Sequence, residues 1–329
     1  MGKPLLPPLA AFLFFALFFS AGAPPQPAHA AETPAYVAIG DSLAFGVGAP
    51  EPLTQGYVGL VHGALQTSER YRDRGLQLVN LAVPGATTAD LLIPGGQLDS
   101  ALKEIRTRRE DTTSADDNVE IISIDIGGND LLSLATPSSP CLDNVGGDAC
   151  IEQFGQVLSS VGKDLREVLR RLREAAPDAG IYLLDLYNPF SGTGDARETV
   201  ADLAVQNLNG VIGALGADKD LKVHMASIFQ LFRGRGLQWI AADGIHPNEN
   251  GHRVIGEVLL ATIDNRAPQI PAELLAQTPA PAASPAGDLP KVGSGDDSGP
   301  GWIVWVLLPV AFAAGTLLAG AYFWARGRA

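Results

Sequence analysis

Residues 35–45 read Ala-Tyr-Val-Ala-Ile-Gly-Asp-Ser-Leu-Ala-Phe, an apolar run that is interrupted at Gly40-Asp41-Ser42. A short apolar run closed by a turn signal is typical of a strand that is buried on both faces of a sheet. A serine on a sharp turn after such a strand can expose its hydroxyl at the edge of the sheet. The motif differs from the G-x-S-x-G elbow of the α/β-hydrolases, because Ala44 stands where that motif needs glycine.

Similar apolar runs recur along the chain and alternate with helical patterns. The candidate strands are Tyr36–Ile39, Leu76–Leu81, Val119–Ile126, Ile181–Leu186 and Leu221–Met225. The clearest helical pattern is a stripe of apolar side chains with a 3.6-residue period from Phe154 to Leu172. Further helices are expected near Tyr57–Gln66, Glu198–Leu215 and Asn248–Ile263. This alternation predicts an α/β fold in which helices cover both faces of a parallel sheet.

Three other stretches combine turn residues with groups that can take part in acyl transfer. Gly85 lies in Asn-Leu-Ala-Val-Pro-Gly-Ala-Thr-Thr (80–88), and Asn129 lies in Ile-Gly-Gly-Asn-Asp (126–130). Sites in parallel sheets form at the carboxyl ends of strands, which is where Ser42 and Asn129 are expected. A backbone N–H of Gly85 and the side-chain amide of Asn129 could both donate to an oxyanion. Each motif taken alone is also an ordinary turn.

His246 is the best candidate for a base that could activate Ser42. It lies in Asp-Gly-Ile-His-Pro (243–247), a loop just before a predicted helix, and loops on a rigid scaffold concentrate catalytic groups. Asp243 could accept a hydrogen bond from the imidazole and fix its tautomer. His252 is the rival base among the five histidines, but it falls inside the following helix and has no equally placed carboxylate.

In this order, the four motifs resemble the SGNH (GDSL-type) hydrolase family over roughly residues 35–265. The resemblance implies a flavodoxin-like three-layer α/β/α sandwich of about five parallel strands. It implies that Ser42 is the nucleophile and that His246, oriented by Asp243, is the base. It also implies an oxyanion hole made by Ser42, Gly85 and Asn129, with no metal or organic cofactor. Members of this family hydrolyse esters of lipids, acetylated sugars or small alcohols, and some are thioesterases.

The alternative is a surface module that keeps the fold but binds a carbohydrate or lipid without catalysis. An inactive copy is expected to have lost at least one of Ser42, Asn129, Asp243 and His246, and all four are present. The sequence therefore favours an ester hydrolase, and a covalent serine probe would discriminate between the two readings. The motifs do not separate lipid esters from acetylated glycans, and they do not indicate an oligomeric state.

The N-terminus has the features of a secretory signal. Lys3 precedes an apolar stretch from Leu5 to Phe19, and an Ala-x-Ala site ends at Ala30. We expect residues 1–30 to be a signal peptide and 31–266 to be the hydrolase domain. An uncleaved membrane anchor is the alternative, although the prolines at positions 4, 7 and 8 disfavour a long spanning helix.

The C-terminus carries a second hydrophobic segment after a change in composition. Residues 267–301 are rich in Pro, Ala, Gly, Ser and Asp, which is typical of a disordered linker. The uncharged stretch Trp302–Trp324 is long enough to cross a bilayer core of roughly 30 Å and has aromatic residues near both ends. Arg326 and Arg328 follow it, so residues 325–329 are expected to be cytoplasmic. The sequence thus predicts a single-pass protein of the cell membrane with an extracytoplasmic catalytic domain.

The net charge and the cysteine count narrow the possible partners and covalent links of the chain. The formal net charge of −13 argues against nucleic-acid binding, which needs a basic face. Cys141 and Cys150 are the only two cysteines, and an even count in an exported chain predicts a disulfide. A metal site is the alternative, but two thiols cannot complete a tetrahedral zinc shell by themselves.

Overall fold

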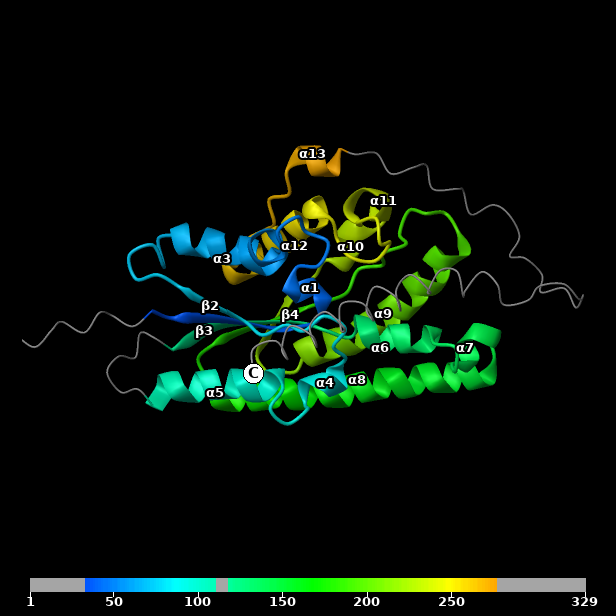
Figure 1. Ribbon diagram of the computed structural model, residues 1–329, viewed down its shortest axis with the longest axis horizontal. Coiled ribbons are helices and arrows are strands. Elements are labelled where there is room, and N and C mark those ends of the chain that lie inside the picture. The colour runs from blue at the N-terminus through cyan, green and yellow to red at the C-terminus, as the bar shows by residue number, and fades with distance from the viewer. Residues whose placement is uncertain (1–32, 111–117, 277–329) are drawn as a thin grey trace, which may run out of the picture. The chain divides into compact units, whose positions relative to one another are not determined.

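A computed structural model describes residues 33–110 and 118–276 of the chain (Figure 1). Five strands form a parallel sheet in the order β2-β1-β3-β4-β5. Their bounds are β1 (Ala35–Gly40), β2 (Gln77–Asn80), β3 (Val119–Asp125), β4 (Gly180–Leu184) and β5 (Val223–Ala226). The predicted α/β class and the parallel sheet with its five strands are confirmed.

Four long helices occupy the positions that the apolar periodicity predicts, namely α3 (Tyr57–Thr67), α8 (Asp148–Ala175), α9 (Ala196–Gly216) and α12 (Glu249–Ile263). One further long helix, α5 (Gln97–Glu110), was not predicted, because only a sparse stripe that includes Leu98, Ala101 and Ile105 is buried. The short helices are α1 (Ser42–Phe45), α2 (Pro52–Gln55), α4 (Thr88–Leu91), α6 (Gly128–Leu132), η2 (Ser133–Ala135), α7 (Pro140–Asp143), α10 (Phe229–Phe232), α11 (Gly236–Trp239) and α13 (Ala272–Leu275).

Successive residues of the central strands face opposite layers of helices. In β1, Val37 and Ile39 belong to one apolar cluster, which also contains buried side chains of α5, α8 and α9. Tyr36 and Ala38 belong to a second cluster with buried side chains of α3 and α12. Figure 1 shows α3 and α12 on one side of the sheet and α5 and α8 on the other. The sheet is thus covered on both faces, and this explains its continuously apolar strands.

The carboxyl ends of β1 and β3 lie side by side, since Gly40 pairs with Asp125 in the register of the sheet. Gly40 has a φ of 152°, and a Cβ at this position would lie 2.3 Å from the backbone oxygen of Asp125. Only glycine fits so close an approach. The segments that follow the two strands, with Ser42 and Asn129, therefore begin at the same edge of the sheet.

The folded domain continues beyond the predicted boundary at residue 266. Helix α13 buries Leu274 in the cluster formed with α3 and α12. The Pro- and Ala-rich composition hid this single helical turn, which lies inside the segment that the sequence predicts to be a linker. In residues 33–110 and 118–276, no helix has the length and hydropathy that a membrane span requires. The predicted signal peptide and the predicted spanning segment Trp302–Trp324 lie outside the described residues.

Candidate active site

Ser42 is the first residue of the four-residue helix α1, which begins directly after β1. The side chain of Asp41 caps this helix by accepting a hydrogen bond from the N–H of Leu43 at 2.9 Å. Gly46 ends it in the left-handed conformation, with a φ of 96°. Capped at both ends, the short helix fixes the position of the Ser42 hydroxyl at the edge of the sheet.

The loop with Asp243 and His246 is held by hydrogen bonds within itself. One carboxylate oxygen of Asp243 accepts from the N–H groups of Ile245 and His246, both at 3.0 Å. The N–H of Ala241 donates to the carbonyl of His246 at 2.7 Å. The Tyr187 hydroxyl donates to the carbonyl of Ile245 at 2.8 Å. These bonds restrict the backbone on both sides of the imidazole.

A continuous chain of hydrogen bonds connects Ser42, His246 and Asp243. The Nε2 atom of His246 lies 2.8 Å from Ser42 Oγ, and its Nδ1 atom lies 2.7 Å from Asp243 Oδ2. The fold thus joins residues that are 204 positions apart in the sequence. If Nδ1 carries the proton and donates to Asp243, then Nε2 presents a lone pair to the serine hydroxyl. This arrangement can remove a proton from Ser42.

Asp243 is held in its charged form. Partial burial works to raise the pKa of its carboxyl, but hydrogen bonds from the His246 ring and from the N–H groups of Ile245 and His246 outweigh that effect and lower the pKa to about 2. The carboxylate is therefore ionised at neutral pH. A fixed negative charge at this position favours the tautomer with the proton on Nδ1 and stabilises an imidazolium that forms transiently.

Ser42, Gly85 and Asn129 surround the same space and differ in how free their donors are. In the described part of the chain, no hydrogen-bond acceptor faces the N–H of Ser42 or of Gly85. Gly85 has a φ of 84° and open space where a Cβ would lie. The amide nitrogen of Asn129, by contrast, donates to the Ala86 carbonyl at 2.9 Å and to Asp41 Oδ2 at 3.3 Å. Two donors are thus open to an oxyanion, and the third is engaged.

Asp130 joins the two donor segments, a role that the sequence did not reveal. Its carboxylate accepts from the Thr88 N–H at 3.0 Å and from the Thr88 hydroxyl at 2.7 Å. Thr88 begins α4, just after the Gly85 turn, while Asp130 directly follows Asn129. These bonds hold Gly85 and Asn129 at a fixed separation. The only signal in the sequence was the position of Asp130 next to Asn129.

Two buried carboxyl groups lie beneath Ser42. The Asp41 N–H lies 3.5 Å from Asp125 Oδ1, and the Tyr57 hydroxyl donates to the other oxygen of Asp125. Burial, together with the nearby charge of Asp125, raises the pKa of Asp41 well above its ordinary range. Burial also raises the pKa of Asp125, to about 6, although hydrogen bonds from Tyr57 and from backbone N–H groups oppose it. It is therefore unfavourable for both carboxyl groups to be charged at once. Asp125 is fully buried and has a structural role, because it bonds to Asp41 and Tyr57.

His252, the rival base, is buried and has both ring nitrogens engaged. Its Nδ1 faces the N–H of Tyr57 at 3.2 Å, and its Nε2 faces the carbonyl of Val47 at 2.9 Å. A neutral ring that accepts at Nδ1 and donates at Nε2 satisfies both partners. Burial lowers the pKa of His252 to about 4, even though the bond to Val47 works to raise it. These contacts join α3, α12 and the segment after α1. They leave His252 without a free ring nitrogen that could accept the proton of Ser42.

The depressed pKa of His252 predicts how stability changes with pH. Its ordinary value is 6.5, so between pH 6.5 and about 4 the unfolded state binds more protons than the folded state. This contribution is fully present above pH 6.5 and is lost as the pH falls, by about 3 kcal/mol at pH 4. A His252→Gln variant lacks the titration. In urea titrations, the free energy of unfolding of the wild type should therefore fall by about 3 kcal/mol more than that of the variant between pH 7 and pH 4. A difference between the two proteins that does not change with pH would contradict this role.

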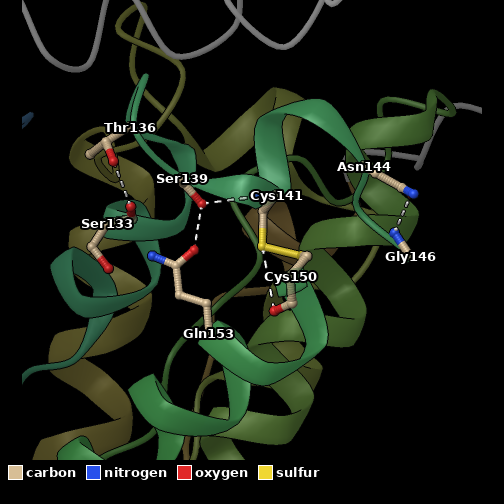
Figure 2. The surroundings of a disulfide bond; sticks show 8 residues. All are labelled: Ser133, Thr136, Ser139, Cys141, Asn144, Gly146, Cys150 and Gln153. Atoms are coloured by element: carbon tan, nitrogen blue, oxygen red, sulfur yellow. Dashed lines mark hydrogen bonds between the residues drawn. A yellow bond between two sulfur atoms is a disulfide. The ribbon is translucent and has the colours of Figure 1, made fainter. Parts of the chain in front are cut away.

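The predicted disulfide is present and connects α7 to the first turn of α8. The sulfur atoms of Cys141 and Cys150 are bonded, and both residues are buried. Figure 2 shows the bond beside a second tie, in which the Ser139 hydroxyl donates to the Gln153 side chain at 2.7 Å. Both cysteines line the cavity that contains Ser42, so the disulfide also restrains the wall of that cavity.

This cavity has a volume of about 430 Å³ and contains all five predicted site residues. Its polar end is formed by Ser42, Gly85, Asn129, Asp243 and His246. The remaining walls come from η2, α6, α7, α8, α9 and the segment between β4 and α9. They are predominantly apolar, with side chains such as Leu131, Leu134, Leu142, Phe154 and Leu186. The site thus places a serine hydroxyl and two open N–H donors at one end of an apolar chamber.

An α/β/α fold that brings serine, histidine and aspartate together at the carboxyl edge of a parallel sheet defines a class of serine hydrolases. Residues 38–254 match the GDSL-like Lipase/Acylhydrolase family. The match spans more than half of the chain, and the chain belongs to this family. It is therefore a carboxylic ester hydrolase of the GDSL, or SGNH, type.

Two curated bacterial proteins are similar in sequence. The spore germination lipase LipC of Bacillus licheniformis is 27% identical over 233 residues, which cover 69% of this chain and 94% of the relative. The uncharacterized protein YpmR of Bacillus subtilis is 25% identical over 244 residues, which cover 70% of this chain and 83% of the relative.

Two solved structures share the fold. The lipase Lip_vut3 from a goat rumen metagenome has a TM-score of 0.52 at 23% identity, covering 70% of this chain and 97% of its own. The extracellular lipase of Streptomyces rimosus has a TM-score of 0.50 at 22% identity, covering 71% of this chain and all of its own. At this level of identity the two structures support the SGNH-like fold.

Proposed function

We propose that this chain is a membrane-anchored, extracytoplasmic hydrolase of lipid esters that acts through an acyl-enzyme on Ser42. The observation that carries the proposal is the Ser42–His246–Asp243 hydrogen-bond chain at one end of an apolar cavity. The name of the LipC relative, a lipase, supports the same substrate class.

In the proposed mechanism, His246 Nε2 accepts the proton of Ser42 Oγ while that oxygen attacks the carbonyl carbon of the ester. The N–H groups of Ser42 and Gly85 donate to the oxyanion that forms. The imidazolium then gives its proton to the leaving alcohol, and the C–O bond to that alcohol breaks. In the second half, His246 takes a proton from water, water attacks the acyl-enzyme, and Ser42 leaves with the proton from the imidazolium.

Asn129 would join the oxyanion hole by exchanging a partner. The bond from its amide to the Ala86 carbonyl is the shorter of the two, at 2.9 Å, and orients the side chain. The bond to Asp41 is longer, at 3.3 Å, and can be given up to a stronger, charged acceptor. Asp41 then retains the Leu43 N–H as a partner. This exchange strengthens the donor set only as negative charge develops, which is what catalysis requires.

The cavity walls favour a long acyl chain over an acetyl group. Burying one methylene in an apolar environment contributes about 0.8 kcal/mol, which corresponds to roughly a fourfold gain per methylene in kcat/KM if the contact persists in the transition state. With a series of p-nitrophenyl esters, we expect kcat/KM of the full chain to rise steeply from acetate towards medium chains and to level off when the cavity is filled. Highest activity on acetate or on acetylated xylan would contradict this substrate class.

Membrane anchoring rests on the sequence of the C-terminus, where Trp302–Trp324 is uncharged and flanked by Arg326 and Arg328. Lys291 is the only basic residue between positions 277 and 301. Trypsin added to intact cells should therefore release an active soluble fragment by cutting after Lys291, and a Lys291→Gln variant should stay on the cells. If the wild-type domain resists release until the cells are lysed, the proposed orientation is wrong.

A further inference from the structure

Several exposed apolar side chains are gathered at the mouth of the cavity. Ile151 and Leu203 are 59% and 64% exposed, and Val145 and Val200 are each 40% exposed, yet all four also line the cavity. Side chains that both line a cavity and face solvent form its rim. Isolated exposed apolar residues need no explanation, but a group around one opening marks an interaction surface. We call these four residues the apolar rim.

The apolar rim is built by two helices that pack against each other and by the turn before the first of them. Val145 precedes α8 and Ile151 lies in its first turn, while Val200 and Leu203 lie on α9. Helices α8 and α9 are in direct contact. Val145 lies between Cys141 and Cys150, and Ile151 directly follows Cys150; the disulfide between the two cysteines restrains this end of α8 (Figure 2). The rim is therefore held by a covalent link and by helix packing, so it can keep one shape against a partner.

The charges around the apolar rim are mostly negative. Asp143, Asp148 and Glu152 are exposed beside Val145 and Ile151. The one basic residue of the rim segments (143–152 and 195–205), Arg197, is paired with Asp195. An anionic surface would be repelled by these carboxylates, whereas an electrically neutral one would not. Burial of the apolar rim would drive association with such a surface.

We propose that the apolar rim docks on an electrically neutral lipid surface, such as a zwitterionic bilayer, so that an acyl chain passes from the lipid into the cavity without crossing water. This inference rests on the proposed lipid-ester activity and adds where the substrate comes from. Exposure of each methylene to water is unfavourable, so a continuous apolar path removes a large barrier for a long chain. The proposed anchor after residue 301 keeps the domain close to a bilayer, which favours this occupant over others.

The test uses the full chain reconstituted in phosphatidylcholine vesicles. Two rates are measured in the same sample: hydrolysis of a long-chain ester resident in the bilayer, and hydrolysis of a water-soluble short-chain ester. Phosphonate labelling of Ser42 counts the folded, reactive enzyme in each preparation. The variant is Ile151→Glu/Leu203→Glu, and the matched control is Leu237→Glu, because Leu237 is 68% exposed but does not line the cavity.

We expect the ratio of the bilayer rate to the soluble rate to fall at least tenfold in Ile151→Glu/Leu203→Glu and to stay at the wild-type value in Leu237→Glu. Vesicles with an added anionic lipid should lower the wild-type ratio. An unchanged ratio in the double variant would overturn the docking proposal. A rise in the soluble rate would also overturn it, since it would indicate that another part of the chain covers the apolar rim. If wild type hydrolyses neither ester, the proposed function itself fails.

Discussion

Replacement of Ser42 by alanine should lower kcat by about 10⁵-fold or more, because the nucleophile and its base act as one unit. The substitution removes only the hydroxyl that lies 2.8 Å from His246 Nε2. The residue keeps its place at the start of α1, where the cap from Asp41 involves the N–H of Leu43. We therefore expect an unchanged unfolding midpoint, together with a residual rate from the remaining oxyanion donors.

The measurement is kcat on a short-chain ester, with thermal unfolding as the check of the fold. Ser160→Ala is a matched control, since this exposed serine on α8 donates to the nearby Asp164 at 3.3 Å and does not line the cavity. It should retain wild-type turnover. A Ser42→Ala variant that keeps more than about a hundredth of the activity would exclude Ser42 as the nucleophile.

His246→Ala should be nearly as damaging as Ser42→Ala, and Asp243→Asn should lower kcat by at least about 10², with up to 10⁴ expected for loss of an analogous carboxylate. The asparagine keeps the shape of the side chain but removes the negative charge that favours the proton on Nδ1. Because the hydrogen bonds that hold the pKa of Asp243 at about 2 are made to the ionised carboxylate, the variant also weakens the loop.

His252→Gln serves as the comparison in the same assay. Both nitrogens of His252 bond inside the core, so this change should lower stability while kcat of the folded enzyme stays within a few-fold of wild type. Near-normal turnover in His246→Ala, together with a collapse in His252→Gln, would reverse the assignment of the base.

Regular periodicity made much of the fold predictable. The central strands β1, β3 and β4 carry largely apolar, buried runs, and α3, α8, α9 and α12 carry long stripes, so local pattern and burial agree in these elements. Helix α5 was not predicted because its buried positions are few among many charged residues. The shortest helices, such as α1 and α6, span less than the window over which a period can be recognised.

The candidate site was predictable in its residue types and not in its supports. The sequence motifs around Ser42, Asp243 and His246 indicated these residues, and the structure brings their side chains together. The bonds from Thr88 to Asp130 and from Asn129 to Asp41 join segments that lie about forty to ninety residues apart, and no local pattern encodes such pairs. The apolar cavity was hidden for the same reason, because its walls come from helices that are separate in the sequence.

The most direct test of the proposed mechanism is to identify the atom that becomes acylated or phosphonylated. Full-length protein is treated with a fluorophosphonate carrying a long alkyl chain, digested, and mapped by mass spectrometry. We predict a single adduct on Ser42, which forms slowly or not at all in His246→Ala. An adduct on a different residue, with the peptide that contains Ser42 unmodified, would contradict the account.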